Sequence, residues 1–115
     1  MRFKDKSVII TGGGGKIAKA YALAFAKEGA KVALPDIASA DQVVDLIKGM
    51  GGTAITMACD VSNESSVRAM VVDVTRQFGT VDVLINNAAY FMSVWKGPFW
   101  EMSVEEFDKA MAVNV

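Results

Sequence analysis

The sequence predicts an α/β fold, in which helices cover both faces of a doubly wound parallel sheet. Short runs of β-forming residues alternate along the chain with segments that have helical periodicity. The runs are nearly continuous in apolar residues, as expected for parallel strands that are buried on both faces. The four expected strands are Ser7–Thr11, Lys31–Leu34, Ala54–Ala58 and Val81–Ile85.

Helical segments are expected after these strands. The segment before the fourth strand has apolar residues at amphipathic spacing, namely Val67, Met70, Val71, Val74 and Phe78. A shorter segment has similar spacing at Val43, Leu46, Ile47 and Met50. Because glycine is favoured just beyond a helix, helix ends are expected at Gly29, Gly49 and Gly79.

Residues 1–115 contain no linker or low-complexity segment, which indicates one domain. The run 81–85 is expected to form an apolar edge of the sheet, and exposed edges of that kind favour aggregation. A last helix is expected to begin near Ser103, and no glycine follows it before Val115. We therefore expect the N-terminal portion of a longer protein, with the sheet truncated after the fourth βα unit.

Composition excludes several classes of function. Hydrophobic residues make up 52% and charged residues 22% of the chain, which excludes a disordered protein. The net charge of −1 indicates no nucleic-acid partner. The chain has no histidine and a single cysteine, Cys59, so we expect neither a metal site nor catalysis through histidine. No secretory signal or membrane-spanning segment is recognisable, which predicts a soluble cytoplasmic protein without membrane contact.

Four glycines, Gly12–Gly15, connect the first expected strand to a helix. Glycines at such a junction let backbone N–H groups approach an anion at the positive end of the helix. The mononucleotide pattern G-x-x-x-x-G-K-[ST] fails, because it requires glycine at Ile10 and a hydroxyl at Ile17. The strict dinucleotide pattern G-x-G-x-x-G also fails at Ile17, whereas the pattern T-G-x-x-x-G-x-G begins correctly at Thr11. A turn without a ligand is the alternative interpretation.

Polar residues follow the later strands at the same edge of the expected sheet. Asp36 closes the second strand, where a carboxylate can accept the ribose hydroxyls of a dinucleotide and repel a 2′-phosphate. Asp60 follows the third strand, and Asn86 and Asn87 follow the fourth, although strands disfavour asparagine. Asn114 falls on the apolar stripe of the last helix, where a buried amide needs hydrogen-bond partners. A solvated or bracing role is the alternative for each of these residues.

Together these motifs resemble the short-chain dehydrogenase/reductase family, whose members have a Rossmann-type sheet. The family transfers hydride between NAD(P) and a secondary alcohol or carbonyl compound. The resemblance implies that the portion 1–115 binds the dinucleotide, with NAD favoured over NADP by Asp36. It implies cofactor contacts from Thr11, Gly12, Gly14, Gly15, Lys16, Ile17, Asp36, Ile37, Asp60, Val61, Asn87, Ala88 and Ala89. It also implies that Asn114 holds a water in the proton relay of the catalytic site.

Two positions depart from the family pattern, because Lys16 and Ala18 stand where the family has glycines. Ala18 adds one methyl group at a contact between helix and strand. Lys16 either puts a Cβ where the backbone approaches the pyrophosphate, or supplies a cation to the phosphates. The sequence leaves both alternatives open.

The family's chemistry also requires a Tyr-x-x-x-Lys pair, which residues 1–115 do not contain. We therefore expect this chain to bind a dinucleotide without turnover. The aromatic residues between Tyr90 and Trp100 favour an apolar alcohol or carbonyl substrate, with packing against another part of the protein as the alternative. The resemblance further implies a homo-oligomeric parent protein. Two other functions stay open, a non-catalytic dinucleotide-binding module and a mononucleotide-binding domain of similar topology.

Overall fold

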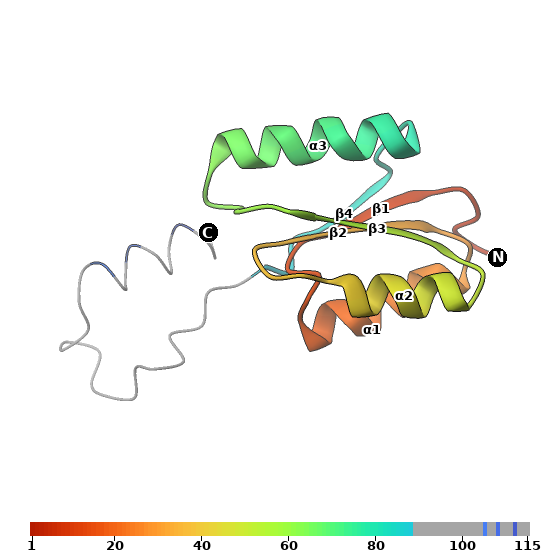
Figure 1. The fold of residues 1–115 in the computed structure, drawn as a ribbon. Coiled ribbons are helices and arrows are strands. Elements are labelled where there is room, and N and C mark those ends of the chain that lie inside the picture. Colours follow the sequence, from red (N-terminus) through yellow and green to blue (C-terminus); the bar gives the residue numbers. More distant parts are fainter. Residues whose placement is uncertain (89–104, 106–107, 109–111, 113–115) are drawn as a thin grey trace.

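Four parallel strands form the central sheet of the part that the structure describes. The computed structural model describes residues 1–88 together with Glu105, Asp108 and Ala112. Within that part the strands pair in the order β3-β2-β1-β4 (Figure 1). Their bounds are Ser7–Ile10 for β1, Lys31–Asp36 for β2, Thr53–Ala58 for β3 and Val83–Ile85 for β4. The predicted parallel α/β sheet is therefore confirmed.

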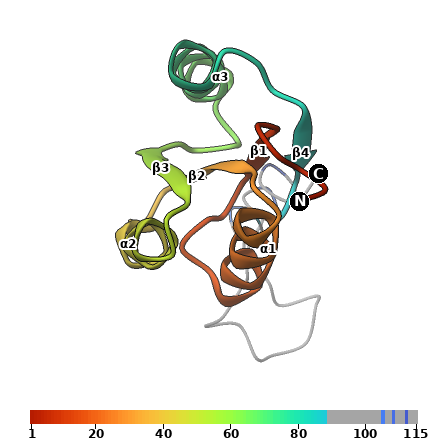
Figure 2. The same ribbon diagram turned by 90° about the vertical axis from the view of Figure 1, so that its right-hand side faces the viewer.

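In the described range 1–88, three helices cover the two faces of this sheet. Helices α1 and α2 lie on one face and α3 lies on the other, as the two views in Figures 1 and 2 show. The chain reaches β4 by crossing from one edge of the sheet to the far side of β1, which is the doubly wound arrangement. The helices are α1 (Lys16–Lys27), α2 (Asp41–Gly49) and α3 (Glu64–Phe78).

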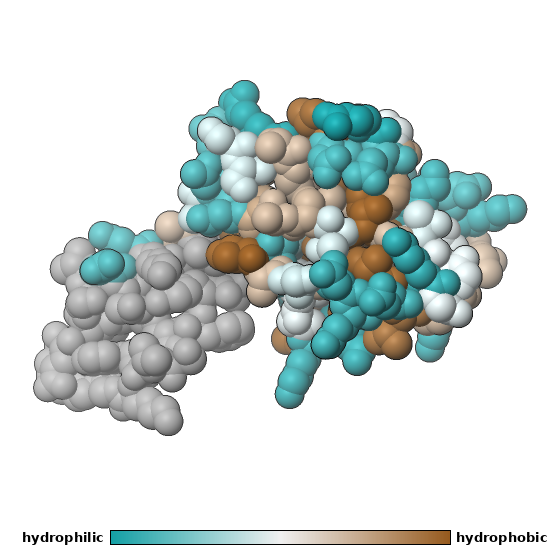
Figure 3. Space-filling model, viewed as in Figure 1, coloured by the Kyte–Doolittle hydropathy of each residue, from teal (hydrophilic) through white to brown (hydrophobic). Residues whose placement is uncertain are grey.

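Side chains that alternate along β1 and β2 divide the core into two layers. Val8 and Ile10 pack toward α1 and α2, whereas Ile9 packs toward α3. The buried face of α1 is made of alanines spaced four residues apart, which lets the helix lie close to the sheet. These alanines are Ala18, Ala22 and Ala26. Seen from outside in Figure 3, most of the visible described surface is hydrophilic or intermediate, with small apolar areas between.

The second strand is longer than the sequence predicts, because β2 continues through Pro35 to Asp36. The carbonyl of Pro35 accepts hydrogen bonds from the N–H groups of Gly12 and Gly13, at 3.0 and 3.2 Å. The nitrogen and carbonyl of one strand residue face the same side, so the proline nitrogen also faces β1, two residues past the last β1–β2 pair, Ile9 with Ala33. The missing N–H therefore falls where the β1–β2 ladder ends, which is a position that a strand between two others can give to proline.

The fourth strand is shorter than predicted, since β4 begins at Val83. The expectation of an apolar edge over 81–85 is wrong for residues 81 and 82. Asp82 interrupts that run, and its carboxylate accepts the N–H of Ser7 at 2.8 Å. The N–H of Asp82 donates to the carbonyl of Ser7 at 2.9 Å. Only Val83–Ile85 pairs with β1 as a strand, and Leu84 is 54% exposed among the described residues.

The end of α2 also differs from its prediction. Gly49 is the last residue of the helix rather than the residue beyond it. The turn that follows is made at Gly51, whose φ of +82° lies in the left-handed region that favours glycine. The longest helix in the described part, α3, has 15 residues, and none there is long and apolar enough to cross a membrane.

Neighbouring residues of α2 allow a matched test of the core between helix and sheet. Ile47 is fully buried, whereas the adjacent Leu46 is 46% exposed. We expect Ile47→Ala to lower the free energy of unfolding by about 2–5 kcal/mol, because it leaves a cavity in a packed layer. Leu46→Ala should cost less than about 1 kcal/mol, as surface substitutions do. Denaturant unfolding of both variants measures the difference, and equal losses would contradict the packing described here.

Candidate functional site

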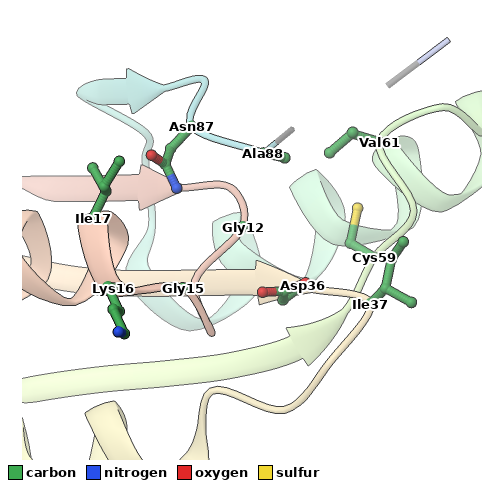
Figure 4. Close-up of a pocket in the computed structure, with 10 residues that line it drawn as sticks. All are labelled: Gly12, Gly15, Lys16, Ile17, Asp36, Ile37, Cys59, Val61, Asn87 and Ala88. Atoms are coloured by element: carbon green, nitrogen blue, oxygen red, sulfur yellow. The ribbon is translucent and has the colours of Figure 1, made fainter. Parts of the chain in front are cut away.

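A cavity of about 470 Å³ opens at the carboxyl edge of the sheet, where the loops after all four strands meet. This edge includes the point at which the strand order reverses, between β1 and β4, and ligands of open α/β sheets bind at such a point. The cavity is lined by Gly12, Gly15, Lys16, Ile17, Asp36, Ile37, Cys59, Val61, Asn87 and Ala88 (Figure 4).

The glycine turn packs directly against the backbone of its neighbours. A Cβ on Gly12, whose φ is +70°, would lie 2.9 Å from the Cα of Ala88. A Cβ on Gly13 would lie 2.5 Å from the Cβ of Leu34 and 2.9 Å from its Cα. Gly13 was not among the predicted site residues, although the run of four glycines was the signal that could have identified it. At both positions no other residue fits without displacing the backbone.

The start of α1 borders the cavity, and no side-chain cap at its N-terminus is seen among the described residues. Gly15 is the N-cap residue and has no side chain to accept a hydrogen bond. The first turn of the helix contains no acidic residue. The N–H groups of such a helix start are available to an anion, whose negative charge the helix dipole stabilises.

Lys16 and Ile17 are the first two residues of α1, and both are exposed. Figure 4 shows their side chains leaving the helix in different directions. In the described part of the chain, no hydrogen bond or ion pair engages the Lys16 ammonium. The structure therefore leaves this cation available to a ligand, at the position where the family has a glycine.

Asp36 contributes a carboxylate at the end of β2. Its Oδ2 atom accepts the N–H of Gly14 at 2.7 Å, and its Oδ1 atom accepts the N–H of Ala38 at 3.2 Å. Each carboxylate oxygen can accept more than one hydrogen bond, so both retain capacity for a further donor. Gly14 itself does not line the cavity, and the structure brings it to Asp36 instead.

Thr11 joins the glycine turn to the loop after β4. Its side chain is buried, with 4% of the residue exposed. The hydroxyl oxygen accepts the N–H groups of Asn87 and Ala88, both at 3.0 Å, and donates to the carbonyl of Ile85 at 3.4 Å. Thr11 does not line the cavity but holds two residues that do.

The loop after β3 provides the opposite wall. Cys59 is only 4% exposed and also lines the cavity beside Val61. Asp60 does not line it, and its carboxylate accepts both the N–H and the hydroxyl of Ser62, at 3.0 and 2.6 Å. The N–H of Asp60 donates to the hydroxyl of Ser66 at 2.9 Å.

Several predicted positions lie outside the described residues. These are Ala89, Asn114, the aromatic segment 90–100 and the helix expected from Ser103, apart from three of its residues. Among the residues that the structure does describe, no three His, Cys, Asp or Glu side chains gather as a metal site.

Known proteins are similar to this chain in both sequence and fold. A family model described as enoyl-(acyl carrier protein) reductase matches residues 14–115. An uncharacterized oxidoreductase of Thermotoga maritima is 44% identical over 117 residues, covering 100% of this chain and 45% of that protein. The crystal structure of a short-chain type dehydrogenase/reductase from Mycobacterium marinum matches with a TM-score of 0.91 and 34% identity, covering 98% of this chain and 45% of that one. The chain belongs to the short-chain dehydrogenase/reductase family.

A further member is a metagenomic short-chain oxidoreductase in complex with NADP. It matches with a TM-score of 0.90 and 31% identity, covering 100% of this chain and 52% of its own. The chain thus spans about half the length of the family members that it matches. The family resemblance predicted from the sequence motifs is confirmed.

Gly13, where a Cβ would clash with β2, and Gly49, where a Cβ would meet open space, allow a matched test of the glycine turn. We expect Gly13→Ala to lower the free energy of unfolding by about 1–3 kcal/mol, because its Cβ meets β2 with no space to move. A Cβ on Gly49 would meet nothing within 4 Å. Gly49→Ala should therefore raise stability by about 0.4–1 kcal/mol, through the lower entropy of the unfolded chain. Thermal unfolding measures both, and a neutral Gly13→Ala would contradict the close approach.

Proposed function

We propose that the protein is an NAD-dependent oxidoreductase that transfers hydride between the nicotinamide cofactor and a secondary alcohol or carbonyl compound. In this proposal residues 1–115 supply the dinucleotide-binding portion. The observation that carries it is the cavity at the carboxyl edge of the sheet, with a glycine turn, a helix start and a carboxylate around it. Family membership supports the reaction class.

Different residues of the cavity lining fit different parts of a dinucleotide, in the order of the strands along the sheet edge. The pyrophosphate would be held at the start of α1, beside Gly12 and Gly15. The adenosine ribose would be held by Asp36, with Ile37 and Val61 as apolar walls for the adenine. The nicotinamide end would lie toward Asn87 and Ala88. The bound cofactor supplies the hydride chemistry, and these residues orient it.

NAD is preferred to NADP in this proposal because the Asp36 carboxylate lies in the cavity wall. A 2′-phosphate beside it would place two negative charges close together, which disfavours binding. The NADP complex described above is that of another family member.

We expect NAD to bind about tenfold or more tightly than NADP, a difference of about 1.4 kcal/mol that one repulsive charge pair can supply. Calorimetric titration of the protein expressed from its full reading frame measures both dissociation constants. NADP binding as tight as that of NAD would mean that Lys16 outweighs Asp36. The hydride transfer itself is tested by NADH formation from a panel of secondary alcohols.

Lys16 is expected to act in one of two ways, and the variants separate them. If the ammonium reaches the phosphates, Lys16→Ala weakens cofactor binding and flattens its salt dependence, since salt screens such attractions. If its side chain obstructs the pyrophosphate, Lys16→Gly tightens binding. Lys27→Ala, at the far end of the same helix, is the control for loss of one exposed cation. Unchanged affinity in both Lys16 variants would leave it without a role in binding.

The remaining parts of the proposal concern residues beyond those described. We propose that the catalytic Tyr-x-x-x-Lys pair lies outside residues 1–115, and that Asn114 holds a water in its proton relay. The substrate is proposed to be an apolar alcohol or carbonyl compound bordered by the segment 90–100, and the protein to be a homo-oligomer. Its cytoplasmic location remains a prediction from the sequence.

A further inference from the structure

Three successive N–H groups fasten the glycine turn to the end of β2. Those of Gly12 and Gly13 donate to the carbonyl of Pro35, at 3.0 and 3.2 Å. That of Gly14 donates to Oδ2 of Asp36, at 2.7 Å. The first two bonds use main-chain groups that any sequence provides. The third depends on one side chain, and it is a charge-assisted bond at the short end of the range for N–H donors.

A side chain at Gly14 would crowd this contact. A Cβ on Gly14 would lie 2.9 Å from Oδ2 of Asp36 and 3.0 Å from the carbonyl oxygen of Ser39. The φ of Gly14 is not positive, so its backbone conformation alone does not demand glycine. Glycine at this position therefore leaves room for the Asp36 carboxylate to approach the Gly14 N–H closely. Figure 4 shows that carboxylate beside the glycine turn, on the side away from Asn87 and Ala88.

We propose that Asp36 is a positioning residue for the glycine turn in addition to its expected part in choosing the cofactor. The two roles use different properties of the side chain. Holding the turn requires an acceptor oxygen, whereas repelling a 2′-phosphate requires a negative charge. The part that concerns cofactor choice rests on the proposed function, and the part that concerns the turn does not.

Two substitutions separate these properties. Asp36→Asn keeps one acceptor oxygen for the N–H of Gly14 and removes the charge. Asp36→Ala removes both the oxygen and the charge. A control with the same loss of one carboxylate is Asp45→Ala, since Asp45 is exposed on α2 and does not line the cavity.

The first measurement is made without cofactor, on the protein expressed from its full reading frame. Hydrogen–deuterium exchange, followed by mass spectrometry on a peptide that spans residues 11–16, reports how firmly the turn is held. We expect Asp36→Ala to accelerate exchange about tenfold, which corresponds to the loss of a hydrogen bond to a charged acceptor. Asp45→Ala should leave the exchange rate within about threefold of the parent protein. Asp36→Asn should fall between that rate and the rate of Asp36→Ala, because a neutral acceptor keeps about half of a charge-assisted bond.

The second measurement is the affinity of each variant for NAD and NADP. We expect Asp36→Asn to raise the affinity for NADP relative to NAD by about tenfold, because the repelling charge is gone while the turn stays in place. Asp36→Ala should show the same relative change, with both affinities about tenfold lower than in Asp36→Asn, because a loosened turn must be ordered on binding.

The outcomes distinguish the two claims. Exchange in Asp36→Ala that equals the parent rate would overturn the positioning role, even if NAD binds as proposed. Accelerated exchange in a protein that binds neither cofactor would support the positioning role and sink the proposed function. Equal acceleration in Asp36→Asn and Asp36→Ala would show that the charge holds the turn. That result would contradict the proposal that the acceptor oxygen holds the turn and the charge selects the cofactor.

Discussion

The pairing of β1 on both of its edges is the constraint on which the rest of the structure depends. β1 hydrogen-bonds with β2 on one side and with β4 on the other, and all four of its residues are buried. Because every strand is parallel, all the carboxyl ends reach the same edge of the sheet. The glycine turn leaves β1 in the middle of that edge, so the loops after the other strands lie on either side of it.

Two polar side chains connect this central turn to its neighbours. The Thr11 hydroxyl accepts N–H groups from the loop after β4, and the Asp36 carboxylate accepts one from the turn itself. Thr11 is buried, so loss of its hydroxyl would remove the acceptor that both of these N–H groups share. The cavity walls are thus held by hydrogen bonds within the protein, and a ligand would enter a site that is already largely shaped.

The elements that the sequence predicted well are those with a strong local signal. Nearly continuous apolar runs identified all four strands, and helical spacing placed Met70, Val74 and Phe78 on the buried face of α3. The errors lie where a contact from elsewhere in the chain overrides the local pattern. Pro35 stays within β2 because it lies past the last residue pair that joins β2 to β1. Asp82 interrupts an apolar run because Ser7 supplies a partner for its carboxylate.

The sequence by itself determined the fold class, the family and the residue types around the site, because hydrophobic periodicity and the glycine motif are local properties. Only the tertiary structure decided which of those residues meet. It brings Cys59 into the cavity wall, turns Asp60 toward Ser62, and requires glycine at Gly13 because β2 lies against it. Such contacts join residues far apart in the chain, and their geometry follows from strand register and helix packing, which no short motif encodes.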